Sequence, residues 1–66
     1  MKLTDFWNRL EQTFGADYAR SVARDQVFSA LGGRSIEQAL ADHLEVHTIW
    51  RAVVAAYPDR VPAALR

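Results

Sequence analysis

Residues 35–57 read SIEQALADHLEVHTIWRAVVAAY and contain neither glycine nor proline. Because those two residues are the strongest helix breakers, their absence alone would predict one long helix. The spacing of the apolar residues indicates otherwise, since Leu44 and Val46 do not extend the apolar stripe that Ile36 begins. We therefore expect two helices with a break at residues 43–45, where a glutamate serves as a weak cap.

Both helices of this segment carry boundary signals. Ser35-Ile36-Glu37-Gln38 matches a capping box, in which the serine hydroxyl and the glutamine side chain each bond a free backbone amide. Pro58 should end the second helix after about Tyr57, because proline lacks the amide hydrogen a helix needs. The outer face of that second helix is predicted to carry His47, Thr48, Arg51 and Ala55.

The first half of the chain predicts two more helices. One begins at Thr4 as N-cap and ends at Gly15, which we expect in the left-handed conformation of a helix C-terminus. The next begins with Asp17 as cap and runs to about residue 30 or 31, before Gly32-Gly33 breaks it.

These patterns define an all-α fold: a compact bundle of three to four short helices, with helix-turn-helix-like features in its second half. Residues 1–57 form a single helical domain, and residues 58–66 form a short proline-containing tail. The pattern leaves open whether Phe28 and the tail are packed. The predicted core is Leu3, Phe6, Trp7, Leu10, Phe14, Tyr18, Val22, Val27, Leu31, Ile36, Leu40, Ile49, Trp50 and Val53.

Length and composition narrow the classes of function. A chain of 66 residues buries only about 60% of its unfolded surface, so its stability is marginal and a homodimer or larger complex is favoured. It has no cysteine, and its eight basic and eight acidic residues cancel, which lowers the expectation of nucleic-acid binding. No signal peptide or apolar run of about 20 residues is present, so we expect a cytoplasmic protein that does not enter membranes.

No pattern of catalytic or metal-binding residues emerges. His43 and His47 have the spacing of the zinc motif H-E-x-x-H, but the glutamate is misplaced and no third ligand is near. No serine stands beside an evident base, and the paired glycines follow a helix rather than a strand. We therefore expect no catalytic, cofactor or metal site, no small-molecule substrate and no enzymatic activity.

Asp25 is the one carboxylate expected at the edge of the core, near Tyr18. It could be a perturbed acid in a cleft, or it could form an ion pair with an arginine such as Arg34 or Arg51. The second interpretation is favoured.

Residues 35–53 also resemble a helix-turn-helix unit. In that interpretation His47, Thr48 and Arg51 face the major groove, while Arg20, Arg24 and Arg34 hold phosphates. The turn glycine is absent, the spacing is about two residues short, and nearby acidic residues would repel DNA.

Several segments taken together resemble a known family. They are LTDFW at 3–7, FGADYA at 14–19, ARDQV at 23–27, GGRS at 32–35, AL at 39–40 and IWRAV at 49–53. This combination is similar to a small family of actinobacterial proteins, domain-of-unknown-function family 3046. The resemblance implies a glycine near His43 and a proline near Val46, both absent here, and a packing cysteine in place of Val54. It implies no activity, although gene neighbourhood suggests DNA repair or recombination.

The sequence thus predicts a non-enzymatic binding module that acts through a protein partner or as a homodimer. A helix-turn-helix-like DNA-binding protein is the alternative. The candidate interaction residues are Arg34, His47, Thr48, Arg51 and Asp25.

Overall fold

The computed structural model describes all of residues 1–66 and is mainly helical, with four α-helices, a very short hairpin and two 3-10 turns. The elements in chain order are α1 (Leu3–Phe14), α2 (Ala16–Asp25), β1 (Val27–Phe28), η1 (Ser29–Leu31), β2 (Arg34–Ser35), α3 (Ile36–Ala41), α4 (Val46–Ala56) and η2 (Ala63–Leu65). The predicted all-α fold is confirmed in its helical character, with four short helices, but the two-stranded hairpin was not predicted.

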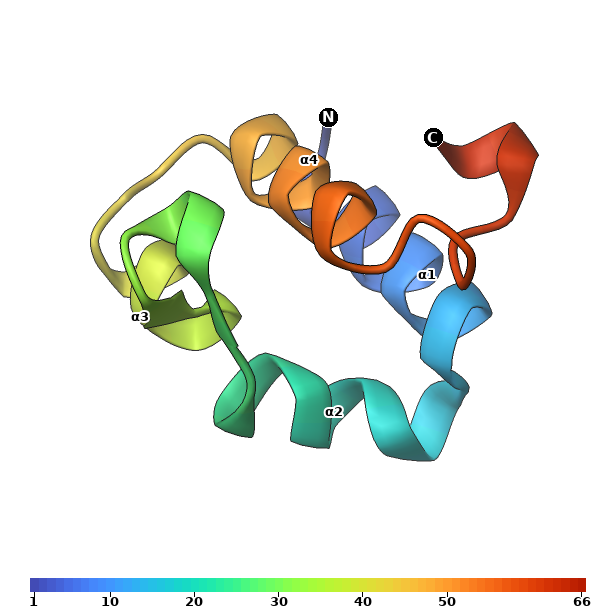
Figure 1. The fold of residues 1–66 in the computed structure, drawn as a ribbon, viewed down its shortest axis with the longest axis horizontal. Helices are drawn as coiled ribbons and strands as arrows, with labels where there is room; N and C mark the ends of the chain where they lie inside the picture. The colour runs from blue at the N-terminus through green and yellow to red at the C-terminus, as the bar shows by residue number, and fades with distance from the viewer.

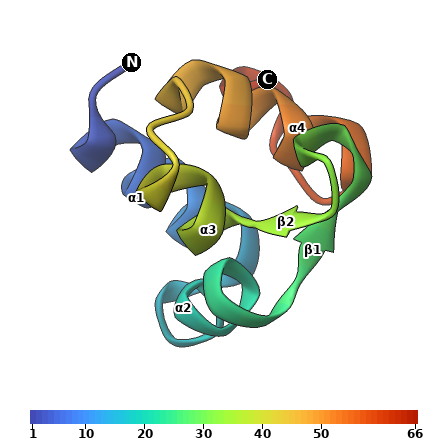
Figure 2. The same ribbon diagram turned by 90° about the vertical axis from the view of Figure 1, so that its left-hand side faces the viewer.

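The helices surround one apolar core. In Figure 1, α4 lies in front of α1 along the upper side, α2 runs along the lower side, and α3 with η1 closes the left side. Figure 2 shows the hairpin between α2 and α4, beside α3. The fully buried large side chains come from every α-helix, from η1 and from the tail: Trp50, Phe6, Leu10, Leu31, Ile36, Ile49, Val22, Val53 and Val61.

A single glycine joins α1 to α2. Gly15 has φ 90° and ψ 149°, a conformation that only glycine adopts readily. It is not the left-handed conformation we predicted. Its amide donates to the Glu11 carbonyl at 2.7 Å, and its carbonyl accepts from the Ala19 amide at 2.9 Å. The same residue therefore ends one helix and begins the next, which sets the two helices side by side.

The two N-caps predicted in this half are wrong. α1 already begins at Leu3, so Thr4 lies inside its first turn, and the cap position is occupied by Lys2 without a side-chain hydrogen bond. Likewise Asp17 lies in the first turn of α2, behind Gly15. Its charge is still favourable there, because the first turn of a helix carries a partial positive charge.

The predicted extent of the second helix is also wrong, because α2 ends at Asp25 rather than near residue 30. Gln26 is extended (φ −83°, ψ 136°), and β1 then pairs antiparallel with β2, with Val27 opposite Ser35 and Phe28 opposite Arg34. Neighbouring strand residues point to opposite faces. Leaving the helix therefore turns Phe28 into the core and Val27 outward, whereas a continuous helix would have left Phe28 off the apolar stripe.

Three residues predicted in the core are exposed. Val27 is 65% exposed on the outer face of the hairpin, Tyr18 is 53% exposed on α2, and Leu3 is 48% exposed at the start of α1. Trp7 and Leu40 are only partly buried. The helical period places these residues near an apolar stripe, but the elements that would cover them lie elsewhere in the fold.

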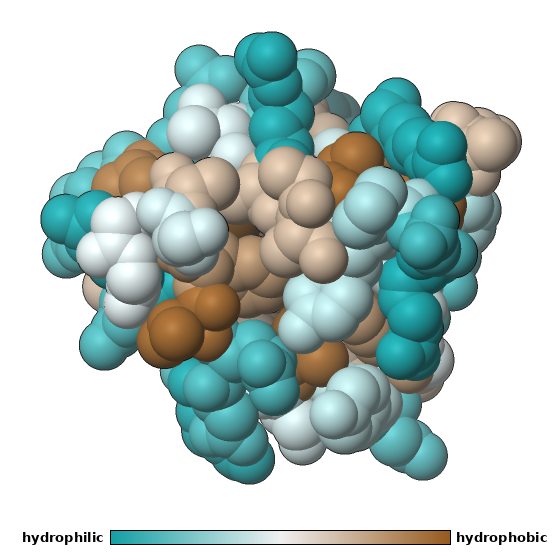
Figure 3. Space-filling view, viewed as in Figure 1, coloured by the Kyte–Doolittle hydropathy of each residue, from teal (hydrophilic) through white to brown (hydrophobic).

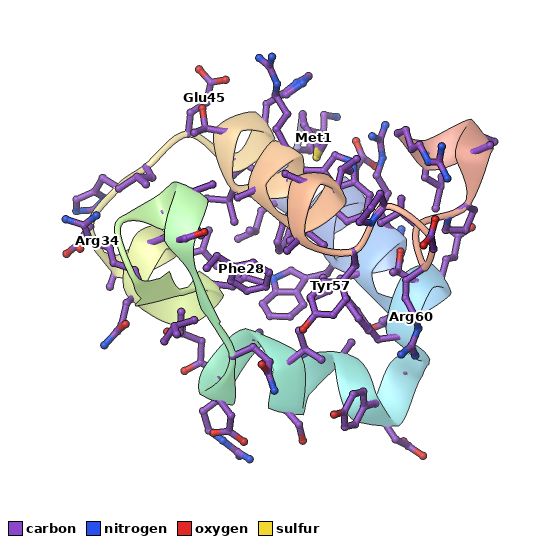
Figure 4. All side chains as sticks on the ribbon, in the orientation of Figure 1. Met1, Phe28, Arg34, Glu45, Tyr57 and Arg60 are labelled. Atoms are coloured by element: carbon purple, nitrogen blue, oxygen red, sulfur yellow. The ribbon has the colours of Figure 1, made fainter.

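Phe28, whose burial the sequence left open, is part of an aromatic cluster. Its ring lies 6.2 Å from that of Tyr57, which in turn makes an edge-on contact with Phe14 at 5.1 Å. In Figure 4 the side chains of Phe28 and Tyr57 approach each other between α4 and α2. Figure 3 shows apolar residues gathered at the centre of this face, surrounded by hydrophilic ones. This cluster connects the hairpin to the end of α4.

The predicted break between the last two helices is confirmed, and its geometry is that of a Schellman motif. The amide of Leu44 donates to the carbonyl of Ala39 and that of His43 to the carbonyl of Leu40, both at 3.1 Å. His43 has φ 61°, the left-handed conformation that glycine adopts most easily. A histidine thus occupies the usual glycine position, which explains why a segment without glycine or proline still divides.

The predicted capping box at the start of α3 is confirmed. The Gln38 amide donates to Ser35 Oγ at 3.1 Å, and the Ser35 amide donates to Gln38 Oε1 at 2.9 Å. Glu45 occupies the N-cap position of α4, as predicted, but makes no side-chain cap hydrogen bond.

The tail folds back on the helices. Val61 is only 2% exposed. The indole Nε1 of Trp50 donates to the Leu65 carbonyl at 2.8 Å, and the guanidinium of Arg9 donates to the same carbonyl at 3.3 Å. In Figure 1 the tail turns back at the upper right, beside α4. No helix in the molecule is both long enough and apolar enough to cross a bilayer.

Candidate interaction surface on α4

The helix α4 has one buried and one open face. Ile49, Trp50 and Val53 face the core, as their spacing predicts. His47 and Thr48 are exposed one turn before Arg51, which is also exposed. These three candidate residues therefore lie on one face of a single helix. They are flanked by two hollows in the surface.

The first hollow, the tail groove, lies between α4 and the tail and has a volume of about 360 Å³. Its lining residues are Arg9, His47, Trp50, Arg51, Val54, Ala55 and Arg66. The apolar residues all belong to α4, while the arginines come from α1, α4 and the tail. No carboxylate side chain lines the groove.

The second hollow, the η1 hollow, has a volume of about 240 Å³ and lies on the other side of Arg51. It is lined by Ala30, Thr48, Arg51 and Ala52. Ala30 comes from η1, which contacts α4 directly. Because Arg51 lines both hollows, its side chain stands between them.

Arg51 differs from the other arginines in having no intramolecular partner. The six others each contact another group: aromatic rings for Arg9, Arg20 and Arg60, carboxylates for Arg24 and Arg34, and a backbone carbonyl for Arg66. Arg51 makes no hydrogen bond, ion pair or cation–π contact. Its five N–H donors are therefore all available to a ligand.

The tail builds one wall of the groove. Arg9 lies 5.9 Å from the centre of the Trp50 ring while bonding the Leu65 carbonyl. The Arg66 guanidinium donates to the Pro58 carbonyl at 2.6 Å, which ties the end of the tail to its beginning. Each of these guanidiniums keeps further donors beyond its one hydrogen bond.

Arg34 is not part of this surface. It donates to the Asp42 carboxylate and to the Leu31 carbonyl, each at 2.9 Å, and so connects η1 to the end of α3. In Figure 4 its side chain lies at the left edge, beside α3. Arg34 therefore lines neither hollow, and its guanidinium is already engaged by Asp42 and Leu31.

Asp25 is also separate, and its predicted position at the core edge is wrong. It is exposed at the end of α2, where its carboxylate accepts hydrogen bonds from Arg24 at 2.9 and 3.0 Å. The ion-pair interpretation therefore holds with a different arginine from the two predicted. The hydrogen bond from Arg24 lowers the pKa of the Asp25 carboxyl and raises the pKa of the Arg24 guanidinium.

The two histidines belong to different elements. His43 lies in the turn after α3 and His47 in the first turn of α4. No group of three or more histidine, aspartate or glutamate side chains gathers anywhere with the geometry of a metal site.

Sequence reasoning missed most of the tail groove. It placed Trp50 in the core, which is right, since Trp50 is buried even though it borders the groove. It did not single out Arg9 or Arg66, because neither belongs to a motif. They meet α4 only because the tail folds back, and no local signal in the sequence reports that.

The fold and this surface define a small, mainly helical domain with a cationic groove beside the open face of α4. Among known families, the model described as a protein of unknown function, DUF3046, matches residues 1–64. The chain belongs to this family, as the resemblance of its segments indicated. The comparisons with curated proteins and with solved structures found no match.

Proposed function

We propose that this protein is a non-enzymatic interaction module that binds a protein partner through the outer face of α4. The observation that carries the proposal is the free Arg51 side chain between the tail groove and the η1 hollow. Arginine is enriched at the energetic centres of protein interfaces, where its planar fork meets carboxylates and carbonyls. A rigid helix presents it here beside apolar surface.

The charge distribution favours a protein over a nucleic acid. DNA binding draws most of its affinity from basic side chains that contact phosphates. Here the chain has no net charge, and Arg24 and Arg34 are already paired with carboxylates. The cationic groups of the tail groove thus form a local patch rather than a continuous basic face.

A cross-linking experiment tests this proposal. A photoreactive amino acid is placed at Thr48, beside Arg51, and in a matched control at Asp17, which is exposed on α2. We expect a discrete protein adduct from position 48 in cells that express the protein, none from position 17, and loss of the adduct in Arg51→Gln. Adducts of equal yield at both positions, no adduct, or an adduct to nucleic acid would contradict the proposal.

DNA binding through α4 is the second candidate, because α3, the turn and α4 follow one another as in a helix-turn-helix and His47, Thr48 and Arg51 are exposed. Two observations argue against DNA binding. Arg34 is already paired with Asp42, and the Glu45 side chain extends into solvent at the N-terminal end of α4, where its negative charge would repel phosphates (Figure 4). Titration of duplex DNA at low and physiological salt decides. Binding that falls steeply with salt and is lost in Arg51→Ala would favour DNA. We propose that the connection with DNA repair or recombination, which gene neighbourhood suggests, comes from the function of the protein partner.

A further inference from the structure

We infer that the tail groove recognises an acidic protein segment that places a carboxylate on Arg51 and an adjacent apolar side chain against Val54 and Ala55. This inference deepens the proposed function, on which it rests, by naming the chemistry of the partner. It rests on the hydrogen-bond donors and the apolar surface that line the groove, both of which a ligand has to match.

The walls of the groove offer more hydrogen-bond donors than acceptors. Arg9 and Arg66 each donate one hydrogen bond within the protein, and Arg51 donates none. A guanidinium has five N–H donors and no acceptor, so most of these donors need a ligand rich in acceptors. A carboxylate satisfies two of them at once in a bidentate pair, and its charge makes those bonds stronger than neutral ones.

The floor of the groove is apolar, which separates this ligand from a simple anion. Val54, which is partly buried, and Ala55, which is exposed, present its apolar surface, while Trp50 lies beneath them and is only 2% exposed. A volume of about 360 Å³ admits one or two side chains, near the lower end of the range for small-molecule sites. A free phosphate or a DNA backbone would leave this apolar floor uncovered, whereas a leucine beside a glutamate covers it.

The test uses a seven-residue peptide of alternating glutamate and leucine, titrated into the full isotopically labelled chain and followed by NMR. We expect the Nε–Hε signal of Arg51 and the Nε1–Hε1 signal of Trp50 to shift together. The same peptide with glutamines in place of glutamates should shift neither. Equal shifts with the glutamine peptide would overturn the inference.

Three variants of the groove sharpen the test. Arg51→Gln should weaken peptide binding about tenfold or more, as expected for the loss of a charge-assisted hydrogen bond, while Arg51→Lys should retain part of it. Ala55→Glu places a carboxylate four residues after Arg51, where it can form an intramolecular ion pair with the guanidinium. This variant should therefore not bind the peptide. The matched controls Arg24→Gln and Gln26→Glu, exposed at the end of α2 and outside the groove, should bind as the unaltered chain does.

Other occupants give distinct results. Inorganic phosphate or duplex DNA that shifts the same signals at lower concentration than the peptide would overturn the inference, as would self-association that depends on Arg51. If position 48 cross-links to a protein while the acidic peptide does not bind, the inference fails and the proposed function stands. If neither occurs, both fail.

Discussion

The Trp50 indole donates a hydrogen bond to the Leu65 carbonyl at 2.8 Å, joining α4 to the tail across 15 positions of the chain. Trp50 also packs edge-on against Phe6, with ring centres 6.1 Å apart. One side chain thus connects α1, α4 and the tail. It thereby helps to hold the tail in place as one wall of the tail groove.

Replacing Trp50 with phenylalanine should lower the free energy of unfolding by about 2 kcal/mol, since a hydrogen bond of about 1 kcal/mol and part of a buried ring are lost. The matched control is Trp7→Phe, because Trp7 is only partly buried and its indole N–H makes no hydrogen bond. We expect that control to lose less than about 1 kcal/mol. Urea denaturation followed by circular dichroism measures both, and equal losses would show that the bond to Leu65 contributes nothing.

Two valines offer a direct test of the tail's packing. Val61→Ala removes two methyl groups from a buried site, so we expect a loss of about 1–2 kcal/mol in unfolding free energy. Val27→Ala makes the same chemical change at an exposed site and should stay within about 0.5 kcal/mol of the unaltered chain. Thermal denaturation of the two variants side by side decides; a larger loss at Val27 would mean that the hairpin, not the tail, is packed.

The two histidines should respond in opposite ways to replacement by glycine. At His43 the left-handed backbone costs a side-chain-bearing residue roughly 1–2 kcal/mol, and the greater freedom of glycine in the unfolded chain offsets part of the gain. We expect His43→Gly to stabilise the protein by about 0.5–1 kcal/mol. His47→Gly, inside α4, should destabilise it by about 1 kcal/mol. Destabilisation by both, measured in urea, would refute the Schellman geometry of this turn.

The pairing of Asp25 with Arg24 makes a pH-dependent contribution with a definite sign. Because the pKa of Asp25 is lowered in the folded state, the pairing stabilises the fold above the ordinary aspartate pKa. This stability is lost as the pH falls through the lower, folded value. Both groups are exposed, so the contribution is small. NMR titration of the side-chain carboxyl carbon should show the pKa of Asp25 returning to its ordinary range in Arg24→Gln; an unchanged value would assign the shift to another cause.

Local sequence signals predicted local structure well in the second half of the chain. The capping box at Ser35 depends on residues three positions apart, and it formed as expected. The break before α4 followed from the phase of apolar residues around Leu44, because helix packing requires each stripe to face one core. Neither conclusion needed knowledge of distant parts of the chain.

Prediction failed where distant contacts outweigh local preference. The helical period continues past Asp25, but pairing of Val27 with Ser35 and burial of Phe28 against Tyr57 favour the hairpin. The exposure of Tyr18 shows the same limit. An apolar stripe identifies the residues of a helix that can be buried, but it does not show which of them another element of the fold covers.

The sequence by itself determined the helical class, the boundaries of α3 and α4 and the outer face of α4 that carries His47, Thr48 and Arg51, because capping and periodicity act over a few residues. Only the tertiary structure decided which other side chains join Arg51. It paired Arg34 and Asp25 elsewhere and brought Arg9 and Arg66 to Trp50 through the folded tail. Contacts across 15 to 56 positions arise from chain topology, which no local pattern encodes.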